Sequence, residues 1–290
     1  LDTLGERNSY SKTDSDATFM RMKEDAMNNG QTKPGFNVQI STENQFITNY
    51  GIYWRPTDTG TLIDYLESFR LRYGRHSTEI VADSGYGSEQ NYEYMFDSGM
   101  IPYVKYNMFH AETKRKYKDN PFLPDNMYYN KEQDYYVCPM GQHMNFVYYK
   151  KEKSDLGYTF IRSVYMAKDC SRCPLRGMCY KGNAEKRTIE VNHRNNAYRA
   201  KVRELLMSEK GMMHRSKRPI EPEAVFGNIK FNHGFKRFRL KSTEKVTVEW
   251  GLVAIAHNLR KYIERKMGNN NYKKLTIDAF ERYMESNMAA

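Results

Sequence analysis

Two acidic residues in this chain could hold metal ions, because each stands where a strand or a helix would present it to a ligand. Asp83 follows the apolar run 80–82 and precedes two closely spaced glycines, and Glu223 lies in a segment opened by two prolines. A pair of Mg²⁺ ions needs carboxylates that converge from different elements. The two acids therefore predict metal-dependent phosphoryl transfer on nucleic acid, with carboxylates within about 10 Å of each other.

Each acid also has an ordinary alternative. Asp83 could cap the helix that follows it, and Glu223 could be a solvated side chain on a surface helix. The residues after Glu223 favour a site, since Gly227 and Lys230 follow it at four and seven positions, and a helix places all three on one face. A carboxylate, bare backbone and a cation on one face suit a metal ion beside a phosphate.

A basic stretch surrounds Glu223. Between residues 215 and 245, nine Lys or Arg stand against three Glu, and the whole chain has a net charge of +11. Such a density is typical of phosphate contacts, which dominate nucleic-acid affinity, and a solvated basic face is the alternative. The candidate DNA contacts are Arg218, Lys230, Lys236, Arg237 and Arg239. Three interleaved phenylalanines, Phe231, Phe235 and Phe238, are expected in the core rather than stacked on bases.

The cysteines form a second possible metal site. All four are clustered, with Cys170, Cys173 and Cys179 close in sequence and Cys138 some way upstream. Such a cluster in a reducing compartment favours structural Zn²⁺ over disulfides, with a Zn–S distance of about 2.3 Å. Reduced unliganded thiols, an iron–sulfur centre and disulfides are the alternatives, and His143 is a reserve ligand.

Composition limits the class of protein. A chain of 290 residues with 39% hydrophobic and 28% charged residues should mostly fold, in one large domain or two smaller ones. No run approaches the roughly 18 apolar residues of a membrane span, and the start does not resemble a signal peptide. We therefore expect a cytoplasmic protein with no membrane partner.

Hydrophobic patterning predicts the elements that would position these residues. An antiparallel hairpin is expected at 36–40 and 45–53, a helix from Asp58 or Thr59 to about Tyr73, strands at 79–82 and 101–105, and a helix at 88–96. A tyrosine-rich β block follows, and then helices at 195–208, around Glu223 and at 246–265. Short helical patches are expected at 17–27 and 277–285. This order predicts an α/β core interrupted by a smaller β-rich domain.

The expected domain organisation follows from these elements. It comprises an N-terminal arm (1–34), a first part of the core (35–108), a β-rich insertion holding the cysteines (109–194), a second part of the core with the Glu223 helix (195–266) and a tail (267–290).

The two acidic motifs, taken in order, resemble those of a known family. Ala82-Asp83-Ser84-Gly85-Tyr86-Gly87-Ser88 and Glu223-Ala224-Val225-Phe226-Gly227-Asn228-Ile229-Lys230 are similar to the second- and third-acid motifs of bacterial insertion-sequence transposases of the DDE type, and residues 33–39, 234–238 and 257–261 agree. The resemblance spans roughly residues 9–265. It implies an RNase H-like mixed sheet with flanking helices, Asp83 and Glu223 as ligands of Mg²⁺ or Mn²⁺, Lys230 near DNA, and transposon ends and target DNA as partners.

One departure from the family pattern matters. The family needs an earlier aspartate on the central first strand, in a segment resembling Asp-Gly-Thr-Lys, and this sequence has none. Asp14, Asp16 and Asp58 are poor substitutes because none follows an apolar strand. The resemblance therefore implies a truncated, inactive transposase lacking its first strand, which could form a homo-oligomer. The alternative is a non-catalytic DNA-binding or partner module derived from a transposase.

Overall fold

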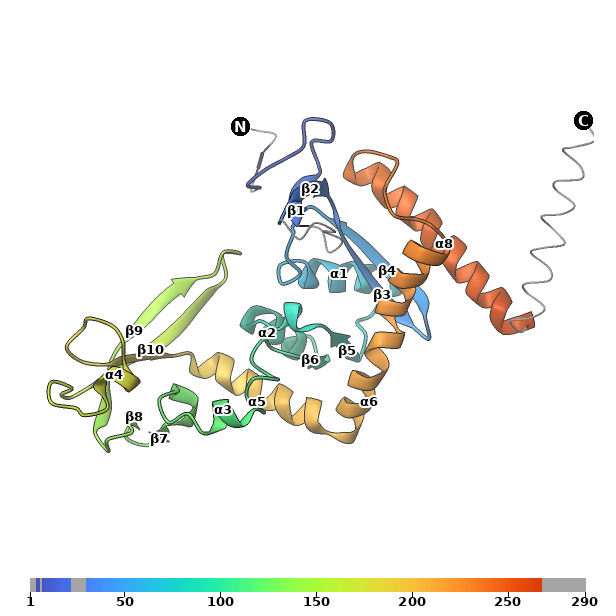
Figure 1. Ribbon diagram of the computed structural model, residues 1–290. Helices are drawn as coiled ribbons and strands as arrows, with labels where there is room; N and C mark the ends of the chain where they lie inside the picture. The colour runs from blue at the N-terminus through green and yellow to red at the C-terminus, as the bar shows by residue number, and fades with distance from the viewer. Residues whose placement is uncertain (1–3, 6, 22–29, 268–290) are drawn as a thin grey trace, which may run out of the picture. The chain divides into compact units, whose positions relative to one another are not determined.

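The protein is described by a computed structural model covering residues 4–5, 7–21 and 30–267 (Figure 1). It has a mixed α/β structure with two compact units. One unit comprises Leu1–His76 with Met213–Ala290, and the other comprises Ser77–Met212. Asp83 and the cysteines belong to the second unit, and Glu223 belongs to the first.

The first unit is built on the expected hairpin. Strands β3 (Asn37–Glu43) and β4 (Phe46–Tyr53) pair antiparallel. The two turn residues, Asn44 and Gln45, both have positive φ, which matches the right-handed twist of a two-residue hairpin turn. The long helix α8 (Thr243–Met267) contacts β4 and buries Trp250 and Ala254 in a shared core with Ile47.

The start of the chain corrects one prediction. The expected helical patch at 17–27 is a strand over its described part, since β1 (Thr18–Arg21) pairs antiparallel with β2 (Thr32–Gly35). Ladder hydrogen bonds to β2 replace the local ones that a helix would need, and Thr and Phe suit a strand. Residues 22–29, and the helix expected at 277–285, lie outside the described residues.

The helix after the hairpin starts later than predicted. Helix α1 spans Leu62–Tyr73, and neither Asp58 nor Thr59 caps it. Asp58 instead accepts hydrogen bonds from the side-chain amides of Asn37 and Gln39, both at 2.9 Å. Its carboxylate is therefore committed to the start of β3 rather than to the helix.

The second unit begins with the strand that leads to Asp83. Strands β5 (Glu79–Ala82) and β6 (Ile101–Val104) pair in parallel, joined by helix α2 (Glu89–Asp97). Gly87 is required here because a Cβ atom would lie 2.2 Å from the carbonyl oxygen of Lys105. The lack of a side chain at Gly87 therefore allows its backbone to pack closely against that of Lys105.

The tyrosine-rich block was predicted to be β-rich, and it forms a five-stranded antiparallel sheet. Its strands lie in the order β11 (Thr188–Val191), β10 (Thr159–Ala167), β9 (His143–Lys153), β8 (Tyr135–Val137) and β7 (Tyr128–Asn130). One face buries Tyr136, Met144, Tyr165 and Ile189. Short turns of helix precede the sheet (α3, Arg115–Lys118; η2, Pro124–Asn126) or interrupt it (α4, Arg176–Cys179).

Helices follow the sheet. Helix α5 (His193–Met207) packs against α2 and β6, and it confirms the helix expected at 195–208. Helix α6 (Glu209–Lys217) was not expected, because its two large apolar residues, Met212 and Met213, are adjacent and form no helical stripe. The turn η3 (Arg218–Ile220) then leads into α7 (Pro222–Gly227) and a π-helical turn, η4 (Asn228–Asn232).

The structure confirms only the broad fold class. A mixed α/β arrangement with an antiparallel five-stranded sheet is present. The RNase H-like core, the status of the sheet as an insertion and the boundaries of the five expected segments stay predictions. Within the described part of the chain, no helix is both long and apolar enough to cross a bilayer.

Candidate active site, nucleic-acid surface and cysteine pocket

Asp83 stands at the carboxyl end of β5, where the sequence placed it. Its side chain is exposed, and its Oδ1 accepts the backbone N–H of Ser84 at 2.6 Å. It thereby caps the short 3-10 turn η1 (Ser84–Tyr86), whereas Ser88 caps α2. Asp83 is therefore a capping residue, as the alternative interpretation expected, but it caps this short turn and not the helix α2. The hydroxyl of Ser84 also donates to Oδ1, at 3.4 Å. A carboxylate has about four acceptor positions, so these hydrogen bonds do not by themselves prevent metal ligation.

Glu223 lies in the first turn of α7. Its side chain is 57% exposed, and its Oε1 is 3.4 Å from the guanidinium of Arg218. Burial of Val225 and Ile229 in the core with Trp250 fixes the helix to β3, β4 and α8. The carboxylate is thus held at the surface by a buried opposite face.

The shared face of Glu223, Gly227 and Lys230 is only partly as predicted. No atom lies within 4 Å of an ideal Cβ built on Gly227, so this backbone is open to a ligand. The helix changes pitch after Gly227, and Lys230 lies in the π-helical turn η4. The seven-residue spacing therefore does not follow one continuous α-helix. Such π turns are frequent at functional sites.

The predicted approach of the two acids stays a prediction, because Asp83 and Glu223 belong to different units. Across residues 4–5, 7–21 and 30–267, no group of three or more His, Cys, Asp or Glu side chains is assembled as a metal site.

The basic stretch presents its charges on an anchored surface segment. Lys236, Arg237 and Arg239 are exposed in the segment 233–242 between η4 and α8. The backbone N–H groups of Arg239 and Leu240 donate to the carboxylate of Glu249 at 2.9 and 3.0 Å. The segment is therefore tied to α8 while its cationic side chains face solvent.

The three phenylalanines of the basic stretch differ in burial. Phe235 and Phe238 pack against Trp250, with ring centroids 5.9 and 6.1 Å away, as expected for core residues. Phe231 is 69% exposed, so its prediction as a core residue is wrong. The turn η4 directs Ile229 into the core and leaves Phe231 outside. No sequence signal separates the three.

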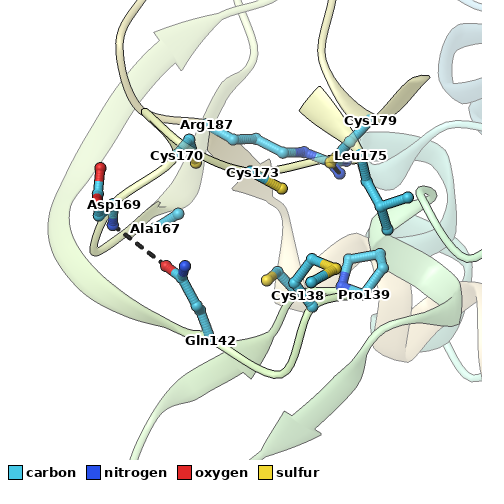
Figure 2. A pocket seen from close by; sticks show the side chains of 11 residues that line it. Cys138, Pro139, Gln142, Ala167, Asp169, Cys170, Cys173, Leu175, Cys179 and Arg187 are labelled. Atoms are coloured by element: carbon cyan, nitrogen blue, oxygen red, sulfur yellow. Dashed lines mark hydrogen bonds between the residues drawn. The ribbon is translucent and has the colours of Figure 1, made fainter. Parts of the chain in front are cut away.

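All four cysteines line one pocket at the end of the five-stranded sheet (Figure 2). Cys138 follows β8, Cys170 and Cys173 lie in the loop after β10, and Cys179 ends α4. None forms a disulfide. His143 stacks on Tyr135 at 3.9 Å between centroids and does not line the pocket.

Arg187 completes this pocket, and sequence reasoning missed it. Its side chain is buried, and its guanidinium donates to Sγ of Cys179 at 2.7 Å and to the carbonyl oxygen of Phe122. A single arginine eight positions after a cysteine carries no sequence signal, so only the fold could reveal the contact.

Comparison with known proteins gave one finding. Residues 137–263 match a family model described as a transposase DDE domain. The matched range contains Glu223, the basic stretch and all four cysteines, and it does not contain Asp83. No curated protein matched the sequence, and no solved structure matched it.

Proposed function

From the match of residues 137–263 to a transposase DDE domain, we propose that this chain binds transposon ends and target DNA. The main support for this proposal is the exposed cationic segment that contains Lys236, Arg237 and Arg239. This segment is hydrogen-bonded to α8 and belongs to the same unit as the Glu223 helix. Exposed Lys and Arg beside a carboxylate suit a phosphate backbone approaching a metal ion. Phe231, exposed after Lys230, offers a flat surface for an unpaired base.

The same proposal assigns Asp83 and Glu223 as ligands of Mg²⁺ or Mn²⁺. Carboxylate oxygens are the ligands these ions prefer, and both side chains are exposed, so a hydrated ion and DNA can reach them. When bound, the ions would activate a water molecule for strand cleavage and then the 3′-hydroxyl of the cut DNA strand for transfer. Arg218 contacts Glu223, so it would lie beside the same phosphate.

We further propose that the 290 residues alone neither cut nor join DNA. A metal pair needs carboxylates on both sides, and Asp83 with Glu223 leaves the central-strand position empty. Asp14 and Asp16 lie before β1 rather than at the end of a strand, and their carboxylates accept the backbone N–H groups of Ser242 and Thr243 at 3.2 and 2.8 Å, at the start of α8. The alternative function, a non-catalytic DNA-binding module, keeps the basic surface alone.

A cleavage assay distinguishes the inactive transposase-like chain from the non-catalytic DNA-binding module. DNA carrying the element's ends is incubated with Mg²⁺ or Mn²⁺ and either this chain or a form extended upstream to include the Asp-Gly-Thr-Lys-like segment. We expect binding by both forms and cleavage by the extended one alone, abolished by Asp83→Asn or Glu223→Gln. Cleavage by the 290-residue chain that Asp83→Asn abolishes would refute the proposed inactivity of these residues alone. Binding without cleavage by either form would support the non-catalytic module.

The metal assignment has a test that needs no activity. Fe²⁺ bound in place of Mg²⁺ reduces added hydrogen peroxide to hydroxyl radicals that cut the nearest backbone, and ascorbate returns the iron to Fe²⁺. If Asp83 and Glu223 share a metal pair, fragments should end near both residues, and Mg²⁺ should suppress them. Cuts near only one acid would show that the two do not share ions.

A homo-oligomer is the last part of the proposal, supported by α8. Val248, Leu252, Ile255, Leu259 and Tyr262 are each more than half exposed, and their spacing of four, three, four and three residues is a heptad stripe. Such a stripe fits a second α8 helix from another copy. Light scattering should then show a dimer that Leu252→Lys with Leu259→Lys dissociates. A monomer at all concentrations would contradict this.

A further inference from the structure

The loop between β10 and β11 has almost no core of its own. Residues 168–186 contain one helix, of only four residues, and none of the residues in this loop is buried. Loops of this length without secondary structure are uncommon, because ordering each residue costs about 1–2 kcal/mol of backbone entropy. The loop returns to the sheet at Arg187, whose carbonyl oxygen accepts the N–H of Ala167 at 2.9 Å. Something other than apolar burial must tie it down.

Three cysteines lie in this loop, and the fourth faces them from a different turn. Cys170, Cys173 and Cys179 line the pocket together with Cys138 (Figure 2). Backbone hydrogen bonds shape both turns. The N–H of Gly141 donates to the carbonyl of Cys138 at 2.8 Å, and the N–H of Cys173 donates to that of Cys170 at 3.4 Å. Cys138 and Cys170 also pack against the sheet core.

The charge on the pocket wall points to an anionic occupant. Arg187 is only 7% exposed, and its guanidinium reaches one sulfur and one carbonyl oxygen. Among the ion pairs of the described residues, none joins Arg187 to a carboxylate. A buried cation without a counter-charge is costly. Four thiolates around one Zn²⁺ carry a net charge of −2 and would provide that counter-charge.

We propose that this pocket binds one Zn²⁺ through Cys138, Cys170, Cys173 and Cys179, with Arg187 balancing the charge of the thiolate cluster. The site is structural and independent of the proposed DNA chemistry, since four protein ligands leave no position for substrate. The sulfurs line one cavity without yet forming a closed ligand group. Binding therefore draws the 168–186 loop and the Cys138 turn together, and part of the metal affinity orders the loop.

Metal content and thiol reactivity test the proposal on the whole chain. The purified protein should contain one zinc per chain, and its four thiols should react with a disulfide reagent only after chelation. Replacement of zinc by Co²⁺ should give the visible spectrum of a tetrahedral tetrathiolate site. Hydrogen exchange of residues 168–186 should be slower with zinc than after chelation. Arg187→Gln should weaken zinc affinity about tenfold or more, as outer-sphere changes do.

Two variants make the assignment specific. Cys173→Ser should lower zinc retention, and His143→Ala should leave it at one per chain because His143 stacks on Tyr135 away from the pocket. If Cys173→Ser fails to fold, the thiol and Co²⁺ measurements on the unaltered chain still decide. Four freely reactive thiols in a metal-free folded protein would overturn the proposal. So would two disulfides, an iron–sulfur spectrum, or zinc retained unchanged in Cys173→Ser.

Discussion

Asn258 binds the backbone of Ile47 through both ends of its side-chain amide. Its Oδ1 accepts the N–H of Ile47 at 2.8 Å, and its Nδ2 donates to the carbonyl oxygen of the same residue at 2.9 Å. Next to it, buried His257 lies 2.9 Å from the carbonyl oxygen of Gln45. These contacts satisfy the edge of β4 that faces away from β3. His257 and Asn258, in the α8 segment 257–261 that agrees with the family resemblance, therefore hold α8 to the hairpin.

Replacing Asn258 should destabilise the first unit without touching the proposed DNA surface. Asn258→Ala leaves the N–H and carbonyl of Ile47 unsatisfied, which should lower the free energy of unfolding by about 2 kcal/mol. Denaturant unfolding measures this directly. Lys261→Ala on the same helix is the matched control and should change stability little. Equal stability of Asn258→Ala and the unaltered chain would show that water replaces the amide at no cost.

His193 links stability to pH. Its Nε2 lies 2.7 Å from the hydroxyl oxygen of Tyr165, and burial lowers the pKa of its imidazole despite an opposing effect of Asp134. The unfolded chain then binds more protons than the folded one below about pH 6.5, so stability is present above that pH and declines as pH falls through it. One such group changes the unfolding free energy by at most about 1.4 kcal/mol per pH unit.

The effect of His193 is measurable by substitution. Thermal unfolding between pH 7.5 and 5.5 should lose less stability in His193→Gln, which retains a hydrogen-bonding group without titrating. His143→Gln, at an exposed position, should keep the pH dependence of the unaltered chain. An identical pH dependence in His193→Gln would show that other groups control acid unfolding.

The elements were predictable where a local pattern and its packing agreed. The hairpin β3–β4, the β5–α2–β6 unit and the tyrosine-rich sheet follow from alternation and turn residues, and their type is as expected. Prediction failed where the deciding contacts are distant. The segment 18–21 is a strand because β2 supplies its partner, and α7 gives way to a π turn that separates Ile229 from Phe231. The sequence singled out the four cysteines that line one pocket but gave no sign of Arg187, and the roles of Asp83 and Glu223 stay predictions.

The segment 233–242 should determine the salt dependence of DNA binding. Lys236, Arg237 and Arg239 are exposed and lie on backbone tied to Glu249. If each displaces about 0.9 counterion, changing all three to alanine should flatten the slope of log affinity against log salt by about two to three. Alanine at Lys116, Lys118 and Lys131, which are exposed in the other unit, is the charge-matched control. An unchanged slope would place the DNA surface elsewhere.

At the scale of the whole molecule, the sheets differ in how completely their strands are paired. β9 and β10 each have neighbours on both sides within a five-stranded sheet. β5 pairs only with β6, and β3 only with β4, among the described strands. Two-stranded sheets are marginal by themselves, and Val81 of β5 is 39% exposed. The resemblance implies an RNase H-like sheet that lacks its central first strand, and this fold stays a prediction.

Hydrogen exchange should therefore rank the strands. Backbone amides of β10 have partners on both sides and should exchange slowest, whereas those of β5 and β3 should exchange faster because partial opening costs less there. Peptide-resolved exchange by mass spectrometry measures this on the chain as it is. An upstream extension that supplies the missing strand should slow exchange in β3 and β5 and leave β10 unchanged. Equal protection of β5 and β10 in the chain alone would show that β5 is already fully paired, and the missing-strand interpretation would fail.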